Sequence, residues 1–422
     1  MIARSRPTVW MASLVSAVLV WAACAPTSQR SATPSASARS SRQPVIGLDW
    51  GTAADVARPA DAFPVQASPT TGPAGPNTAG HPGHFPGQAV MSDVALRDGR
   101  FVAVGYVGPS PWRPIAWTSD DAQHWDLVEI SIAASDENTF AVSVAATTNG
   151  FVAVGRAGQR PAAWTSSNGT AWTRREVPVL GRTSDWERMT VVEAGPDGLI
   201  AGGSVGPELL DRRARFWRSG DGARWTTVPD DGAFAGSEVT ALEQITHGWL
   251  ALGRIGTGQR TTGSTTWRST DGVRWARDDD ASIAVGYARA VTRAPDGALV
   301  AVGSEPDELA AYAWRSTDEG STWQQAPDAP ALTHFGRKVR MTDVVAMPDG
   351  VLAVGNLVEV QYGTGMSWRS TDGLTWEPSP VQAPFGQAEP LAVVAGGPGY
   401  VAVGDFGAPD DYIPRVWITP PG

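Results

Sequence analysis

Short apolar runs that end in glycine recur seven times along the chain at nearly constant spacing. The terminal glycines are Gly105, Gly155, Gly203, Gly253, Gly303, Gly355 and Gly404. Successive glycines lie 50, 48, 50, 50, 52 and 49 residues apart. Repeats of this length are typical of propellers and arrays, in which each unit buries its apolar surface against its neighbours. The pattern therefore predicts one all-β domain built of seven similar units.

Each repeat is predicted to form four short strands, named A to D in chain order. In the sixth repeat these segments are residues 342–347, 351–355, 367–370 and 374–377, with Pro348-Asp349-Gly350 and Thr371-Asp372-Gly373 at two of the turns. Asp-Gly pairs between β-prone runs are strong hairpin signals, because both residues tolerate positive φ. Strand B is apolar on both faces, which is typical of a strand covered on both sides. We therefore expect four-stranded antiparallel blades that cover one another.

The turn between strands C and D carries the most specific motif. In the fifth repeat it reads Ser316-Thr317-Asp318-Glu319-Gly320-Ser321-Thr322-Trp323. This segment resembles the Asp-box, or bacterial neuraminidase repeat, of sialidase-like β-propellers at every specified position. Shorter copies end at Trp172, Trp225, Trp275 and Trp376, and the first copy, Ser119 to Trp125, lacks the glycine. The resemblance covers residues 90–422 and implies a β-propeller.

The Asp-box residues are expected to have a structural role, because a motif present in nearly every blade cannot serve one substrate. The aspartate should accept backbone N–H bonds, the glycine should adopt the left-handed conformation, and the tryptophan should pack the turn onto the sheet. A recurrent arginine after the strand C tryptophan should stack on the strand D indole. The box positions are Asp121, Asn168, Asp221, Asp271, Asp318 and Asp372, and the arginines are Arg218, Arg268, Arg315 and Arg369.

The last repeat lacks a strand D. Strand C tryptophans occur at positions 117, 164, 217, 267, 314, 368 and 417, but no seventh strand D follows before Gly422. Upstream, Leu48-Asp49-Trp50 followed by Pro59 to Phe63 is similar to the segment from Arg224 to Phe234. We expect residues 45–57 to pair with the strand C that carries Trp417. This pairing would close a seven-bladed ring and remove the sheet edges between the first and last repeats.

Residues 1–23 are predicted to be an export signal. Arg4 and Arg6 precede an uncharged, mostly apolar stretch from Val9 to Ala23, which is too short for an ordinary transmembrane helix. The stretch ends at Cys24, the only cysteine, and Ala22-Ala23-Cys24 resembles a bacterial lipoprotein processing site, although Trp21 stands where that family usually has leucine. The resemblance implies a lipid anchor at Cys24 on the outer face of the cell membrane. Secretion after simple cleavage is the alternative.

The remaining sequence is divided by composition. Residues 24–43 are rich in Ser, Ala, Pro, Thr and Arg and are expected to form a disordered tether. The propeller would span 44–422, with the closing strand in 44–65, a loop in 66–88 and the repeats in 89–422. The loop contains His81 and His84, which are a weak metal signal, and we predict no metal site and no cofactor.

A net charge of -10 argues against a nucleic-acid partner.

A ligand site should lie where the repeats differ. At the start of strand A the chain crosses from the rim to the central channel, and the residues there are Val90, Phe140, Arg188, Glu238, Tyr287, Arg340 and Glu389. They should ring one mouth of the channel, beside Trp186, Glu187, Arg289, His334 and Lys338. We predict a ligand site formed by the polar members, namely Arg188, Glu238, Tyr287, Arg340 and Glu389. A solvated rim of ion pairs is the alternative.

Three functions are compatible with these features. The first is a monomeric, lipid-anchored, non-catalytic propeller that binds a protein or a glycan, with the anchor as its only membrane contact. The resemblance to sialidases implies the second, a glycoside hydrolase acting on cell-surface sugars, with Tyr287, Glu238, Arg188 and Arg340 as catalytic candidates. A third arginine, an acid aspartate and the Arg-Ile-Pro segment of sialidases are missing, and sialidases are usually six-bladed. The third is an assembly or stability factor, because some Asp-box propellers resemble photosystem assembly factors.

Overall fold

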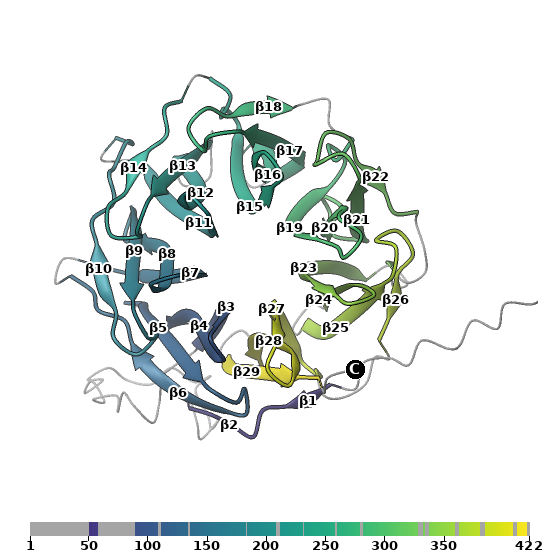
Figure 1. The fold of residues 1–422 in the computed structure, drawn as a ribbon, viewed down its shortest axis with the longest axis horizontal. Coiled ribbons are helices and arrows are strands. Elements are labelled where there is room, and N and C mark those ends of the chain that lie inside the picture. The colour runs from purple at the N-terminus through teal and green to yellow at the C-terminus, as the bar shows by residue number, and fades with distance from the viewer. Residues whose placement is uncertain are drawn as a thin grey trace, which may run out of the picture. The chain divides into compact units, whose positions relative to one another are not determined.

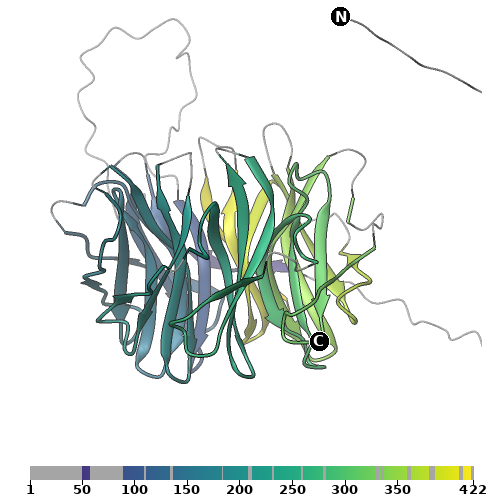
Figure 2. The same ribbon diagram turned by 90° about the horizontal axis from the view of Figure 1, so that it is seen from above.

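The propeller is a closed ring of seven β-sheets around a central channel (Figure 1). The computed structural model describes residues 50–57, 89–108, 111–133, 136–182, 184–207, 212–230, 232–257, 260–278, 282–327, 332–333, 337–358, 363–379, 385–407 and 412–419. These residues belong to one compact unit, 47–422. They contain no helix, and so none that could span a membrane. Seen from the side, the strands run between the two faces of the ring (Figure 2).

Each blade contributes one strand to each of four concentric layers. The innermost strands are β3 (Ala89–Arg97), β7 (Thr139–Thr147), β11 (Trp186–Gly195), β15 (Ser237–Ile245), β19 (Tyr287–Arg293), β23 (Lys338–Met347) and β27 (Ala388–Gly396). The second strands are β4 (Arg100–Val107), β8 (Gly150–Ala157), β12 (Gly198–Gly206), β16 (Gly248–Thr257), β20 (Leu299–Ser304), β24 (Gly350–Val358) and β28 (Gly399–Phe406). The third strands are β5 (Arg113–Ser119), β9 (Arg160–Ser166), β13 (Arg213–Ser219), β17 (Arg260–Ser269), β21 (Ala311–Ser316), β25 (Gly363–Ser370) and β29 (Ile413–Ile418). The outer strands are β6 (His124–Glu129), β10 (Thr173–Arg175), β14 (Thr226–Thr227), β18 (Ala276–Asp278), β22 (Gln324–Gln325), β26 (Glu377–Pro378) and, for the last blade, β1 (Gly51–Thr52).

The N-terminal strand closes the ring, as predicted. In β1, Thr52 pairs with Trp417 of β29, and the Trp50 indole donates a hydrogen bond to Ser367 Oγ (3.0 Å). The chain then continues to the first blade, where β2 (Asp55–Val56) pairs in parallel with β6. The first blade therefore has five strands instead of the expected four. Residues 50–57 join the last and first blades directly.

The hydrophobic core consists of seven clusters, each shared by two neighbouring blades. The cluster between the last and first blades, for example, combines Val401 and Val416 with Met91 and Trp117. All seven strand C tryptophans have 0 % of their surface exposed. Because every sheet is covered on both sides, the two apolar faces of strand B follow directly from the ring.

The turns between the third and outer strands combine hydrogen bonding with packing. In the third blade, Asp221 Oδ1 accepts bonds from the backbone N–H groups of Ala223 and Arg224, and the Trp225 indole donates to the Gly222 carbonyl (2.9 Å). Gly222 has a φ of +74°, and a Cβ there would lie 2.5 Å from Val152 of the preceding blade. In the first blade, Ala122 occupies the glycine position with a φ of +62°.

The recurrent arginines do not stack on the outer tryptophans, and this expectation is wrong. Arg315 binds Asp296 (2.5 Å) and Arg369 binds Asp349, both on the neighbouring hairpin, while Arg268 binds Asp278 (3.3 Å). The cations over tryptophan rings in these blades come from the outer strands instead, as with Arg277 over Trp267.

Candidate functional site

Every innermost strand contains a β-bulge near the start of the strand, which the sequence patterns did not predict. The register shifts by one residue between Met91 and Asp93, and at the equivalent point in the other six blades. The residues at the bulges are Ser92, Val142, Thr190, Thr240, Arg289, Thr342 and Leu391. All seven line one cavity of about 500 Å³, at the mouth of the channel where the innermost strands begin. A bulge re-aims a side chain, and here it turns one residue per blade toward the cavity.

The repeated glycine of strand B is explained by the bulge. In each blade this glycine pairs with the residue immediately before the bulge, as Gly303 does with Ala288. A Cβ at Gly303 would lie 1.9 Å from the carbonyl oxygen of Tyr287, and equivalent contacts of 1.8 to 2.5 Å occur in all seven blades. The glycine is thus required by the close approach of two backbones. The signal for the bulges was present in the sequence as the most regular feature of the repeat.

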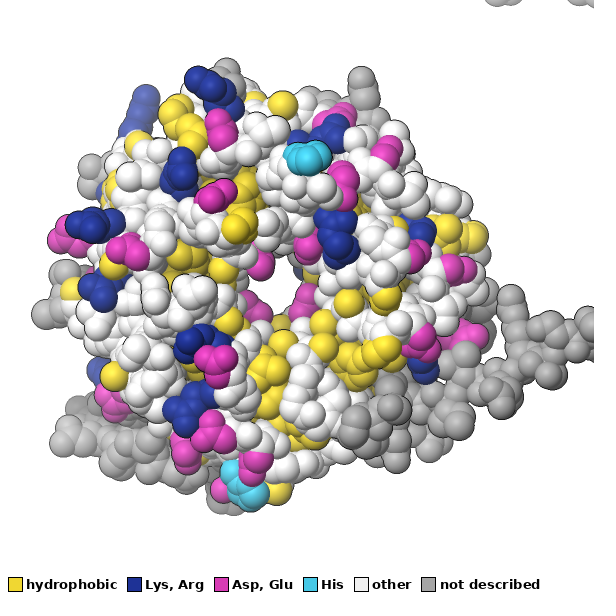
Figure 3. Space-filling view, viewed as in Figure 1, with side chains coloured by type: hydrophobic (Ala, Val, Ile, Leu, Met, Phe, Trp, Pro, Cys, Tyr) yellow, Lys and Arg dark blue, Asp and Glu magenta, His cyan; other side chains and the backbone are white. Residues whose placement is uncertain are grey.

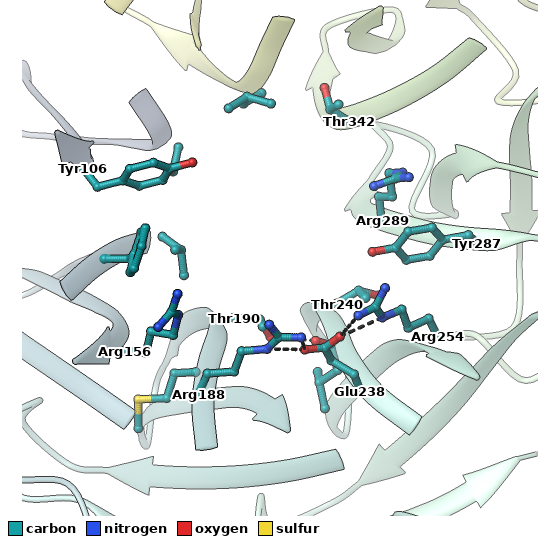
Figure 4. Close-up of a pocket in the computed structure, with 16 residues that line it drawn as sticks. Tyr106, Arg156, Arg188, Thr190, Glu238, Thr240, Arg254, Tyr287, Arg289 and Thr342 are labelled. Atoms are coloured by element: carbon teal, nitrogen blue, oxygen red, sulfur yellow. Dashed lines mark hydrogen bonds and ion pairs between the residues drawn. The ribbon is translucent and has the colours of Figure 1, made fainter. Parts of the chain in front are cut away.

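The predicted ring of mouth residues divides into two groups. Arg188, Glu238 and Tyr287 line the cavity (Figure 4), and Phe140 is also a lining residue. Val90 is buried in the wall. Arg340 and Glu389 are not among the lining residues; they bind each other, with Arg340 Nη2 3.0 Å from Glu389 Oε2. The structure therefore brings three of the five predicted ligand residues together, while the other two form an ion pair.

Glu238 is enclosed by three arginines. Its carboxylate lies 2.5 Å from Arg188 Nη2, 2.5 Å from Arg254 Nη2 and 3.1 Å from Arg212 Nη1, and it accepts a bond from Ser204 Oγ (2.9 Å). Only 4 % of its surface is exposed. Burial by itself would raise the pKa of Glu238, but the three guanidinium groups outweigh burial and lower it to about 2. Arg254 lines the cavity and Arg212 contacts Glu238, and the sequence patterns identified neither residue.

Arg289 is the one charged residue at a bulge. It donates to Glu308 Oε1 (2.6 Å) and lies over the Tyr287 ring, 4.0 Å from its centroid. The equivalent positions in three other blades are threonines, whose hydroxyls are used within the wall. Thr190 Oγ1, for example, donates to the carbonyl of Val239 in the next blade (2.7 Å). Arg289 therefore contributes charge to the cavity where other blades contribute an already bonded hydroxyl.

Aromatic side chains form the side of the cavity opposite Tyr287. The Tyr106 ring packs edge-on against Phe140 (4.9 Å) and Trp112 (5.5 Å). Arg156 lies over Phe140, 4.1 Å from its centroid, and over the half-buried Trp186 at 5.0 Å. In Figure 4 the hydroxyls of Tyr106 and Tyr287 point toward the middle of the cavity from opposite sides. Neither has a hydrogen-bond partner within the described parts of the chain.

The other predicted neighbours of the mouth have different surroundings. Glu187 is buried, and its carboxylate accepts bonds from the backbone of Leu180 and Gly181, which is a structural role. Lys338 is exposed at the start of β23. His334 lies outside the described residues, as do Cys24, the tether and the loop with His81 and His84.

The rest of the channel is acidic. Carboxylates are visible around the central opening in Figure 3. Enclosure within the ring raises the pKa of Asp93 to about 6, of Glu243 and Asp343 to about 7, and of Glu193 to about 8. Asp93 and Asp343 also tie blades together, since each accepts a backbone N–H of the next innermost strand (2.8 Å). These four carboxyl groups lie on the innermost strands and are not among the residues that line the cavity at the mouth.

No family model and no curated protein matches this chain. Among solved structures it is similar to PorZ, a surface component of the type-IX secretion system of Porphyromonas gingivalis, with 10% identity over 77% of this chain and 46% of that one, and a TM-score of 0.52. It is also similar to a Trypanosoma rangeli sialidase in complex with sialic acid, with 13% identity over 78% and 54% and a TM-score of 0.45. A protein of unknown function from Dyadobacter fermentans matches with 14% identity over 79% and 95% and a TM-score of 0.47. The chain spans about half the length of the PorZ and sialidase chains. At these identities the likeness shows the β-propeller fold alone.

Proposed function

We propose that the protein is a non-catalytic binding propeller, whose channel mouth takes up an anionic group of a glycan or a protein. The observation that carries this proposal is the charge of the cavity. Its lining contains four arginines, Arg156, Arg188, Arg254 and Arg289, and one carboxylate, Glu238. The chain as a whole has a net charge of -10, so the mouth is locally positive on a protein that is negative overall. Anions would be attracted to the mouth and repelled elsewhere.

The location of the protein is part of the proposal. We propose that the export signal directs the chain across the membrane, that Cys24 carries the lipid anchor, and that the propeller acts as a monomer on the outer face of the cell. Fractionation tests this: the wild type should be found with membranes, and Cys24→Ser should be released. Equal membrane association of both proteins would contradict the anchor.

Binding is favoured over glycoside hydrolysis by the state of Glu238. A general base must accept a proton near neutral pH, and a carboxylate with a pKa of about 2 does so poorly. Of the two arginines that the resemblance to sialidases would assign to catalysis, Arg188 is paired with Glu238 and Arg340 is paired with Glu389. Release of fluorophore from a panel of fluorogenic glycosides, abolished by Tyr287→Phe or Glu238→Gln, would overturn this preference.

The experiment is a comparison of anionic and neutral glycans and peptides on an array, followed by calorimetric titration of the best ligand. Arg156→Gln removes charge without disturbing the Glu238 network and should weaken binding about tenfold. Arg100→Gln, whose exposed ion pair with Asp120 lies at the opposite end of the first blade, is the matched control and should bind like the wild type. Affinity should also fall as salt is raised. Tight binding of neutral ligands that is insensitive to Arg156→Gln would refute the proposal.

A further inference from the structure

We propose that the anionic group bound at the mouth is carried by a six-membered ring, and that Tyr106 and Phe140 form the wall against which this ring packs. The inference rests on the proposed anion site and adds the chemical class of its ligand. Some blades contribute mainly apolar side chains to the lining of the cavity, and other blades contribute mainly charged ones.

The division follows the order of the blades around the ring. The last, first and second blades supply Leu391, Tyr106, Phe140 and Val142 to the lining, defined here as the apolar half, together with the polar Ser92 and Arg156. The third to fifth blades supply Arg188, Glu238, Arg254, Tyr287 and Arg289, which are defined as the cationic half. Arg156 lies at the border between the two. A small inorganic anion would occupy the cationic half and leave the apolar half in contact with water.

The apolar half is rigid. Tyr106, Phe140 and Trp112 contact one another pairwise, with centroid distances of 4.9, 5.5 and 5.9 Å. Such a cluster fixes the orientation of the two rings that reach the cavity. Leu391 and Val142 stand at bulge positions of the last and second blades, where most other blades have threonine or arginine, and the first blade between them has the small Ser92. A rigid apolar surface suits the flat face of a ring.

The cavity also offers hydrogen bonds to substituents on such a ring. The hydroxyls of Tyr106 and Tyr287 face its middle from the two halves, without partners within the described parts of the chain (Figure 4). Burial, together with the nearby Asp405, raises the pKa of Tyr106 to about 12, so its hydroxyl keeps its proton and remains a donor. About 500 Å³ accommodates one substituted ring with its anionic group.

Two sources share this chemistry, an acidic pyranose and an aromatic carboxylate, and the test separates them. The full-length protein is titrated in a calorimeter with acetate, methyl glucoside, methyl glucuronide and benzoate. We expect at least one of the two ring anions to bind about tenfold more tightly than acetate. Binding of methyl glucuronide identifies the sugar, and binding of benzoate alone identifies the aromatic acid. Methyl glucoside, which lacks charge, should bind more weakly than the ring anions.

Substitutions of Phe140 and Tyr106 test whether these two residues form the wall against which the ring packs. Phe140→Leu keeps apolar volume but removes the aromatic ring, over which Arg156 also lies, and should lower the affinity for ring anions about threefold to tenfold and that for acetate by less. Tyr106→Phe keeps the ring and should weaken methyl glucuronide only. Tyr400→Phe, at the far end of the last blade, is the control. Saturation-transfer NMR on the wild type gives a readout independent of variant folding, since ring protons of the ligand should receive saturation from aromatic side chains.

The outcomes distinguish the two proposals. If acetate binds as tightly as the ring anions, or if Phe140→Leu affects all anions equally, the ring inference is overturned and the anion site stands. If none of the three anions binds at concentrations of about 10 mM, both proposals fail.

Discussion

Glu238 provides the sharpest test of how the channel mouth is held together. We expect Glu238→Gln, which keeps the shape of the side chain but removes its charge, to leave three arginines facing one another without a counter-ion. The pKa of Glu238 is lowered from 4.5 to about 2. At about 1.4 kcal/mol per pKa unit, the ionised carboxylate stabilises the fold by about 3 kcal/mol at neutral pH. This agrees with the cost of about 3 to 5 kcal/mol for breaking a buried ion pair.

The pH dependence of this loss has a definite sign. Because the folded-state pKa lies below the unfolded value, the contribution is complete above about pH 4.5 and is lost as the pH falls toward 2. The difference in unfolding free energy between wild type and variant should therefore shrink from about 3 kcal/mol at pH 7 to about 1 kcal/mol at pH 3. Urea denaturation followed by tryptophan fluorescence measures both values.

Glu319→Gln is the matched control. The pKa of Glu319 is also lowered to about 2, chiefly by Arg293, but 36 % of its side chain is exposed to solvent. Solvent screening should reduce its contribution to below about 1 kcal/mol. A loss below about 1 kcal/mol for Glu238→Gln at pH 7, or a loss that does not change with pH, would refute the idea that three arginines stabilise this carboxylate.

Three further predictions concern the ring. Gly303→Ala places a Cβ 1.9 Å from the Tyr287 carbonyl and should cost about 3 kcal/mol, whereas Gly220→Ala, with open space around it, should be nearly neutral; equal denaturation midpoints would contradict the close-approach explanation. Because enclosure raises the pKa of the channel carboxyl groups, their stabilising protonated form is lost as the pH rises, so the unfolding temperature should fall from about pH 5 to about pH 8.5, and Glu193→Gln should flatten this decline. Trp50→Ala should cost about 3 to 5 kcal/mol by opening the closure, and calorimetry showing an unchanged transition would argue against closure by residues 50–57.

The sequence contained more information about the site than its patterns revealed. The cross-strand pair of Glu238 and Arg254 follows from the hairpin register, since Arg254 is the residue immediately after the repeated Gly253. The repeated glycine ends each apolar run in the sequence, and its regularity also marks the bulge opposite it. Arg212 could not have been predicted, because it lies in a variable loop with no repeat equivalent. The pairing of Arg340 with Glu389 joins two adjacent blades and required the order of the ring.

The sequence by itself determined the number of blades, the repeat of four strands and the strand that closes the ring, but not the fifth strand of the first blade. These features depend on local periodicity and on tryptophans and glycines that recur at fixed positions, so they can be recognised in the linear sequence. Only the tertiary structure decided which side chains meet at the channel mouth and which of them neutralise one another. The reason is that residues about 50 positions apart become neighbours across blades, and the charge of the cavity depends on whether each arginine finds a carboxylate there.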